Sequence, residues 1–287
     1  IRKRIAADGP ITVADFMEMA LGHPEHGYYM KGDPLGATGD FITAPEISQV
    51  FGELIGLWSA MTWQQIGAPA KIILVECGPG RGTLMSDLLR AAKTVPPFLD
   101  AVEIHLVETS PAMRERQRAT LTGHTPQWHD SLETVPPGPT VLIANEFLDA
   151  LPIRQLIRTE NGWAERRVSL SDNRLVFETG DDVSDTNLTV PPHEAPALPG
   201  RIFEICPAAL NFADTLNRRL SNTPGAALFI DYGHGKSGVG DTLQAVRSQK
   251  FADILAHPGD ADLTAHVDFD AFGGRLRGGG SRTMGPV

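Results

Sequence analysis

Two acidic residues and three closely spaced glycines have the types and spacing of a site for a nucleotide-like ligand. Glu76 lies near the end of an apolar run at residues 71–77, and glycines follow at positions 78, 80 and 82. Glu108 ends the next apolar run, at residues 102–108. Glycine lets the main chain approach a ligand closely, and the N-terminus of a following helix presents free backbone N–H groups. We therefore expect residues 76–82 to form the centre of a ligand site.

The glycine spacing separates two kinds of ligand. A dinucleotide-binding turn has its third glycine three residues after the second, with an acid about twenty residues further on. Here Gly82 comes two residues after Gly80, and Thr83 occupies the place of that third glycine. Glu76 beside the turn disfavours a pyrophosphate. S-adenosyl-L-methionine fits better. The glycines would let the main chain approach its amino-acid part, and Glu108 would accept its two ribose hydroxyls. The sequence favours this cofactor, and a tight turn without a ligand is the alternative.

Polar residues also end two later apolar segments. Asp130 and Ser131 follow one, and Asn145 and Glu146 end the run at residues 140–146. Because ligands of an open α/β sheet lie beyond the carboxyl ends of its strands, we expect a crevice lined by these groups. The predicted cofactor-binding residues are Glu76, Gly78, Pro79, Gly80, Gly82, Glu108, Thr109, Asp130, Ser131, Asn145, Gly39 and Thr43.

Methyl transfer from a sulfonium needs alignment of donor and acceptor and exclusion of water more than acid–base help. A nitrogen acceptor also needs a carboxylate or carbonyl to orient it and to spread its charge. Glu146 and Asn145 are the first candidates for that catalytic role, and Asp149 and Asp40 are the second. The alternative for the first pair is that they cap the segment that begins at Phe147.

An α/β fold would position these residues. The apolar runs predict strands at residues 71–77, 102–108, 125–130, 140–146 and 225–232, the last ending near Asp231, and helices at residues 81–92, 110–121 and 207–220. Ser110 and Pro111 are typical of a helix start. Asn-Gly at 161–162 and Asp-Asn at 172–173 predict an antiparallel meander at residues 153–178. Residues 179–200 are predicted to form an exposed linker.

The flanking segments are less regular. Residues 11–21 predict a helix capped by Thr12, and residues 48–63 predict a broader apolar helix. The loop at residues 23–48 contains glycines and aromatic residues that suit a lid over the cofactor pocket. His23 and His26 in this loop are weak candidates for a metal site, and we expect no metal. Residues 273–287 are glycine-rich, and we expect a poorly ordered tail without an apolar face.

Composition limits the partners. The 287 residues carry a net charge of −10 without a basic block, which disfavours nucleic acid and is compatible with a basic substrate. Two cysteines make no disulfide framework, which favours a reducing compartment. No segment is as apolar as a membrane span. We expect a cytoplasmic protein, or a protein of the mitochondrial matrix if a transit peptide has been removed.

Four segments together resemble the MidA family of S-adenosylmethionine-dependent methyltransferases. They are GDFITAPEISQVFGELIG at 39–56, VECGPGRG at 75–82, VETSP at 107–111 and ANEFLDALPI at 144–153. The resemblance implies a class I (Rossmann-like) methyltransferase sheet in which Gly78, Gly80, Gly82 and Glu108 match cofactor positions. It places Asn145 and Glu146 on the acceptor side. Mitochondrial members of the family are complex I assembly factors associated with symmetric dimethylation of an arginine in a complex I subunit.

The sequence patterns and the resemblance together predict the domain organisation. Residues 1–70 would form an N-terminal helical segment with the lid, and residues 71–287 a methyltransferase domain with the meander and linker inserted at about 153–200. The hairpin that normally completes such a sheet is not evident after the fifth strand. The oligomeric state stays open. Two other functions are kept as alternatives: a non-catalytic assembly chaperone that retains the cofactor-binding fold, and a nicotinamide-dependent oxidoreductase.

Overall fold

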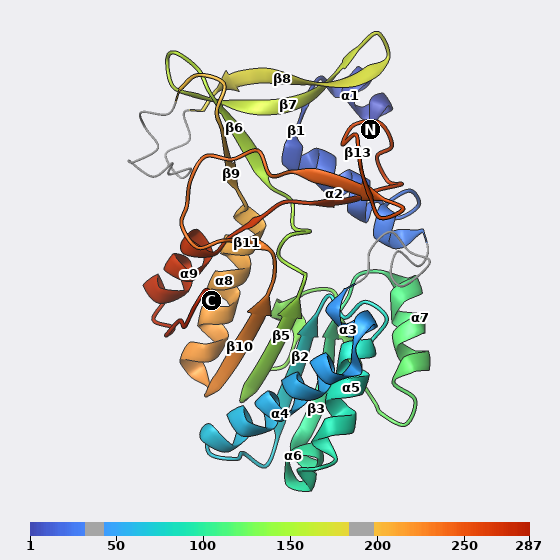
Figure 1. Ribbon diagram of the computed structural model, residues 1–287, viewed down its shortest axis with the longest axis vertical. Coiled ribbons are helices and arrows are strands. Elements are labelled where there is room, and N and C mark those ends of the chain that lie inside the picture. Colours follow the sequence, from blue (N-terminus) through green and yellow to red (C-terminus); the bar gives the residue numbers. More distant parts are fainter. Residues whose placement is uncertain (32–42, 184–197) are drawn as a thin grey trace.

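A five-stranded parallel sheet forms the lower half of the molecule in the view of Figure 1. The computed structural model describes residues 1–31, 43–183 and 198–287. The strand order is β10-β5-β2-β3-β4, and every pair in it is parallel. The strands are β2 (Ile72–Cys77), β3 (Val102–Val107), β4 (Gln127–His129), β5 (Thr140–Asn145) and β10 (Gly225–Ile230). The predicted α/β class is therefore confirmed.

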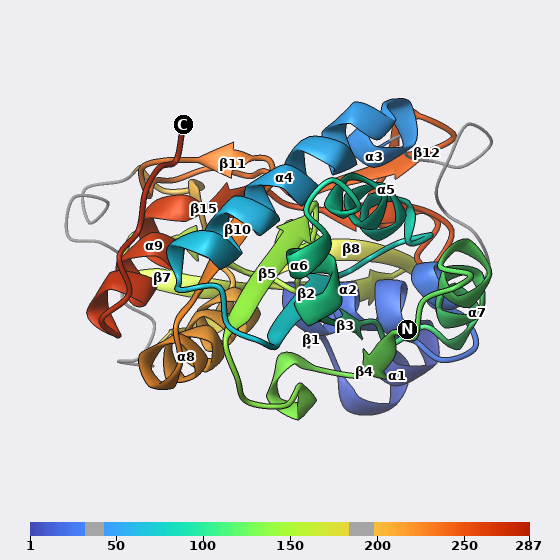
Figure 2. The same ribbon diagram turned by 90° about the horizontal axis from the view of Figure 1, so that it is seen from below.

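Helices cover both faces of this sheet. Its central strands are buried on both faces, and their sequences are therefore continuously apolar. One face packs against α4 (Gln49–Gln65), α5 (Thr83–Ala92) and α6 (Pro96–Ala101). The other face packs against α8 (Pro207–Asn222) and α9 (Phe269–Gly278). Along β2 the alternation is strict, because Ile72 and Leu74 belong to the first core and Ile73 and Val75 to the second. Figure 2 shows α4 and α5 on one side of the sheet and α8 on the other.

The predicted meander is confirmed, and it belongs to a separate antiparallel sheet (Figure 1). Its strands are β6 (Arg154–Arg158), β7 (Trp163–Ser171) and β8 (Arg174–Asp182). Two further strands that the sequence did not predict complete the sheet: β1 (Ile11–Thr12) pairs with β7, and β9 (Ile202–Ile205) pairs with β6. The N-terminal segment is thereby tied to the meander.

The N-terminal and C-terminal parts of the chain share a third core. α1 (Arg2–Asp8) and α2 (Val13–Gly22) pack near a small antiparallel sheet made of β12 (Gln244–Arg247), β13 (Lys250–Ala252) and β14 (Asp262–Thr264). Phe16 and Met17 of α2 are fully buried in this core together with Leu263 of β14. The predicted cap of α2 is confirmed, since Thr12 and Asp15 form a reciprocal capping box. A domain boundary at residue 70 stays a prediction.

Two expectations about the end of the chain have different outcomes. The expected poorly ordered tail without an apolar face is wrong for residues 273–278, because they belong to α9. It buries Phe272 and Leu276 against α8, and Asp268 caps its first turn. The glycines hid this helix, since only three large apolar residues, Phe269, Phe272 and Leu276, carry its contact. Within the described residues, β10 is an edge strand of the parallel sheet, and the hairpin β12–β13 pairs with β14 instead of extending that sheet.

The start of α5 also differs from its prediction. The helix begins at Thr83 rather than at residue 81, because Gly82 has a left-handed conformation with φ of 82°. α7 (Pro111–Thr120) has its predicted N-cap, Ser110, and its predicted Pro111 at the first position. Residues 32–42 of the predicted lid lie outside the described residues, as do residues 184–197 of the predicted linker. No described helix has the length and apolar character that crossing a membrane requires.

Candidate active site

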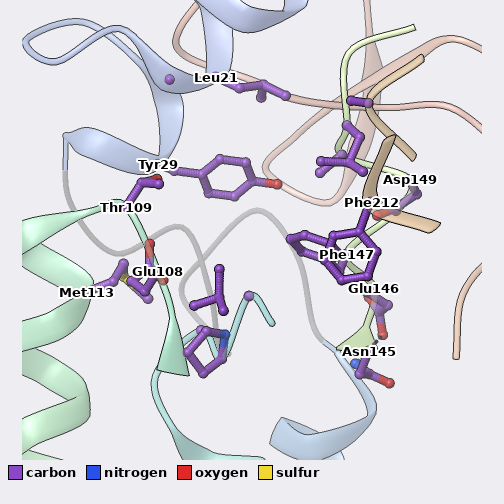
Figure 3. A pocket seen from close by; sticks show the side chains of 18 of the residues that line it. Leu21, Tyr29, Glu108, Thr109, Met113, Asn145, Glu146, Phe147, Asp149 and Phe212 are labelled. Carbon is purple, nitrogen blue, oxygen red and sulfur yellow. Dashed lines mark hydrogen bonds between the residues drawn. The ribbon is translucent and has the colours of Figure 1, made fainter. Parts of the chain in front are cut away.

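A cavity of about 830 Å³ lies at the carboxyl edge of the parallel sheet. Its wall includes the ends of β2, β3 and β5, and Tyr29 projects into it from the N-terminal segment (Figure 3). The structure brings together the following predicted site residues in this wall: Thr43, Glu76, Gly78, Pro79, Gly80, Glu108, Thr109, Asp130, Ser131, Asn145, Glu146 and Asp149. Gly82 lies behind the wall as the N-cap of α5. Gly39 and Asp40 lie outside the described residues.

The turn after β2 is built from glycines in left-handed conformations. The φ angles of Gly78 and Gly80 are 63° and 52°, values that favour glycine over residues with a side chain. A Cβ atom on Gly78 would lie 3.1 Å from Cδ2 of Phe147. The turn therefore presents main-chain atoms to the cavity, as the sequence predicted.

Glu76 and Asn145 supply two buried acceptors without partners. Glu76 is only 3% exposed, and its Oε2 has no hydrogen-bond partner among the described residues. Burial raises the pKa of Glu76 to about 8. Oδ1 of Asn145, on the neighbouring strand β5, is likewise buried without a described partner. A buried unpaired acceptor is costly, so two of them beside one cavity fit a ligand that brings hydrogen-bond donors or a positive charge.

Glu108 is held in place at the end of β3. Its Oε1 accepts the backbone N–H of Ser110 at 2.8 Å, and its Oε2 accepts Nε2 of Gln117 at 3.2 Å. Burial raises the pKa of Glu108, and these hydrogen bonds oppose the rise. Each carboxylate oxygen keeps a second lone pair, so Glu108 can still accept two hydroxyl groups.

Gln117 is a site residue that sequence reasoning missed. Its Nε2 also donates to the carbonyl oxygen of Gly80 at 2.7 Å, and its Oε1 accepts Nε1 of Trp128 at 2.8 Å. Gln117 is fully buried although it lies on a polar helix, α7. A single glutamine among charged residues gave no signal, because only the packing of α7 beside the turn buries it.

Glu146 has a strained backbone at the opposite end of the cavity from Glu108 (Figure 3). Its φ is 47°, which is uncommon for a residue with a side chain. Burial raises the pKa of its carboxyl, whereas hydrogen bonds from the backbone of Ala44 and the side chain of Asn145 lower it. Such strain persists where surrounding contacts enforce it and is frequent at functional sites.

Further carboxylates gather around Glu146. Asp149 is 6% exposed, and burial, Asp231, Asp262 and Glu146 together raise its pKa to about 8. Asp262 comes from β14, far along the chain, and accepts the hydroxyl of Tyr29 at 2.8 Å. Burial, then the charge of Asp262, raises the pKa of Tyr29. Sequence reasoning missed Tyr29 and Asp262, since neither lies at the end of a parallel strand.

The two ends of the cavity differ in chemistry. The end near Glu76 and Glu108 offers main-chain atoms and acceptors for hydroxyl or ammonium groups. The end near Glu146 and Asp149 brings several carboxyl groups together. Phe147 lies beside it at 5.4 Å from Phe212 of α8, measured between ring centroids. Within the described ranges, no group of three His, Cys, Asp or Glu side chains is placed to hold a metal ion.

Known proteins are similar to this chain in sequence and in fold. A family described as "Putative S-adenosyl-L-methionine-dependent methyltransferase" matches residues 54–287. A Xenopus tropicalis relative named "Protein arginine methyltransferase NDUFAF7, mitochondrial" is 38% identical over 99% of this chain and 71% of its own. The Homo sapiens protein of that name is 36% identical over 99% of this chain and 69% of its own.

A solved structure provides the third comparison. It is a Burkholderia thailandensis protein, described as a "likely methyl transferase" and bound to S-adenosyl-homocysteine. It superposes with a TM-score of 0.84 at 30% sequence identity, over 97% of this chain and 75% of its own.

Proposed function

This chain belongs to the family of S-adenosyl-L-methionine-dependent methyltransferases, and we propose that it methylates an arginine side chain of a protein. The cofactor of the family, S-adenosyl-L-methionine, supplies when bound a methyl group on a positively charged sulfur. The observation that carries the arginine proposal is the group of carboxyl side chains at one end of the cavity: the buried Asp149 and Asp262 and the partly buried Glu146.

The residues of the first end fit this cofactor. Glu76 and Asn145 would hold its ammonium group, because both present buried acceptors without a described partner. Glu108 would accept the ribose hydroxyls. The main chain at Gly78 and Gly80 would lie against the amino-acid part. Thr43, Pro79, Thr109, Asp130 and Ser131 complete the wall on this side.

The residues of the second end fit a guanidinium group. A guanidinium carries a positive charge and five N–H donors, which match several carboxylates better than one. Transfer to a guanidinium nitrogen also requires that nitrogen to lose a proton. Glu146 is the proposed acceptor of that proton, since its raised pKa makes it a stronger base than an exposed glutamate. Asp149 would orient the group, and Asn145 would orient Glu146.

The names of the relatives support a compartment and a substrate. They describe mitochondrial protein arginine methyltransferases, which favours the mitochondrial matrix over the expected cytoplasmic location. The family resemblance supports a complex I subunit as the proposed substrate. The family match disfavours the oxidoreductase alternative. The carboxylates around Glu146 favour an active enzyme over a non-catalytic chaperone.

Labelling tests the proposal. The protein is incubated with S-adenosyl-L-methionine labelled on its methyl group and with a mitochondrial extract, and labelled peptides are identified by mass spectrometry. We expect the label on arginine, and we expect none with a Glu108→Ala variant. Label on lysine, on a carboxylate or on a small molecule would overturn the arginine assignment and leave the family assignment intact.

A further inference from the structure

The turn after β5 is held by a single carboxylate, that of Asp231, which follows β10. Its Oδ2 accepts the backbone N–H groups of Phe147 at 3.1 Å, Leu148 at 2.8 Å and Asp149 at 3.3 Å. Its Oδ1 accepts the backbone N–H of Tyr232 at 2.8 Å. One side chain therefore satisfies four backbone donors at the carboxyl ends of two adjacent strands.

The same arrangement fixes the strained conformation of Glu146. The backbone N–H of Glu146 donates to the carbonyl oxygen of Ile230 at 2.8 Å, just before Asp231. The three peptide groups that follow Glu146 all point their N–H bonds at Asp231. A left-handed backbone at a residue with a side chain persists only where neighbouring contacts enforce it. The contacts to Ile230 and Asp231 provide that enforcement on both sides of Glu146.

We propose that Asp231 is a positioning residue, which acts through this turn to hold Glu146 and Asp149 against the acceptor. The inference rests on the proposed function, in which these two side chains face the acceptor. Asp231 is not among the described residues that line the cavity, so it would act through other residues and would not touch the substrate. Its Oδ2 accepts hydrogen bonds from the backbone of the turn, and this turn carries the side chains of Glu146 and Asp149.

Asp231 also has an electrostatic effect on Asp149. After burial, the charge of Asp231 is the largest cause that raises the pKa of Asp149, and Asp262 and Glu146 add to it. Tyr29 and Tyr232 are the other titratable groups coupled to Asp149. A neutral side chain at position 231 that keeps an acceptor oxygen should leave the turn intact and lower the pKa of Asp149. Two substitutions of Asp231 can therefore distinguish its effect on the geometry of the turn from the effect of its charge on Asp149.

The test compares Asp231→Ala with Asp231→Asn in the full chain. Asp231→Ala removes the acceptor, so we expect faster hydrogen exchange at the amides of residues 147–149. We also expect a loss of kcat on the order of 100-fold, the effect of a small misplacement of reacting groups. The affinity for S-adenosyl-homocysteine, measured by calorimetry, should stay within threefold of the wild-type value. This affinity also shows that the variant is folded.

Asp231→Asn should keep slow exchange at residues 147–149 and most of kcat. It should shift the pKa of Asp149, measured by carboxyl-carbon NMR, to lower pH by about one unit or more. The acidic limb of kcat/KM should shift in the same direction. The matched control is Asp268→Ala, which removes the cap of α9 and should change none of these quantities.

Two results would overturn the inference. One is an Asp231→Ala protein with unchanged exchange at residues 147–149 or with kcat within threefold of wild type. The other is an Asp231→Asn protein in which the pKa of Asp149 does not move. Exchange and NMR need no acceptor, so they decide the inference even if the wild-type protein methylates no arginine and the proposed function fails.

Discussion

The side-chain amide of Gln117 donates a hydrogen bond of 2.7 Å to the carbonyl oxygen of Gly80. This contact joins α7 to the glycine turn after β2, and the same amide reaches Glu108 at 3.2 Å. Gln117 thus sets the distance between two parts of the proposed cofactor site that come from different strands. Its own carbonyl oxygen is fixed by Trp128, so the amide cannot rotate without leaving a buried donor unpaired.

Replacing Gln117 by leucine should weaken binding of S-adenosyl-homocysteine on the order of 10-fold, the effect of losing about one hydrogen bond to each of two ligand-binding groups. It should also lower the melting temperature, because the Trp128 N–H loses its partner. Calorimetry and thermal unfolding measure the two effects. Gln127→Leu on β4 is the control, since Gln127 is exposed and should leave affinity unchanged. Equal affinities for the two variants would contradict the role of Gln117.

Alanine substitutions at two glycines with left-handed backbones can distinguish the cost of backbone strain from the loss of a ligand contact. Gly80 and Gly123 have φ of 52° and 92°, and an added Cβ at Gly123 meets nothing within 4 Å. Alanine at either position should destabilise the fold by about 1–2 kcal/mol. Only Gly80→Ala should also reduce cofactor affinity, because its Cβ would occupy space beside the ligand. A Gly80→Ala protein that binds S-adenosyl-homocysteine like Gly123→Ala would show that the turn has no contact with the cofactor.

The raised pKa of Glu76 predicts that the stability of the ligand-free protein depends on pH. Its pKa is about 8 in the folded protein, above that of an unfolded glutamate, so the unfolded state loses the proton first. The contribution of Glu76 to the free energy of unfolding should therefore be largest below its pKa in the unfolded state and be lost as pH rises to about 8, by at most about 1.4 kcal/mol per pH unit. Thermal unfolding at pH 5, 6, 7 and 8 measures it.

Glu76→Gln should flatten this dependence and weaken S-adenosyl-homocysteine binding, because the ammonium group loses its carboxylate. Asp149 has a similar raised pKa, so a residual slope should remain. The exposed Glu115→Gln is the control for both measurements. A slope identical to wild type in Glu76→Gln would mean that Glu76 is ionised in the folded protein.

Glu146→Gln should leave cofactor affinity unchanged and lower kcat on the order of 100-fold or more, as expected on loss of a general base. Glutamine keeps the size of the side chain and much of its hydrogen bonding, so the turn should persist. Methyl transfer at saturating cofactor is the measurement, and Glu160→Gln in the exposed β6–β7 turn is the control. Full activity in Glu146→Gln would remove this residue from the mechanism.

Much of the cofactor side could be predicted because its residues are local in sequence. Glu76, the glycine turn and the start of α5 follow one another, and hydrophobic periodicity places a strand before them. Parallel strands then bring Glu108 and Asn145 to the same edge without further information. The acceptor side could not be predicted in this way. Tyr29 and Asp262 meet only because α2 and β14 share a core, and no local pattern records that packing.

The sequence by itself determined the parallel sheet, its carboxyl-edge crevice and the type of cofactor, since apolar runs and glycine spacing are properties of neighbouring residues. Only the tertiary structure decided which carboxylates meet, how Asp231 holds the turn after β5, and that Gln117 is buried. Those features depend on contacts between residues far apart in the chain. Such contacts form only when distant segments of the chain pack together in the folded protein.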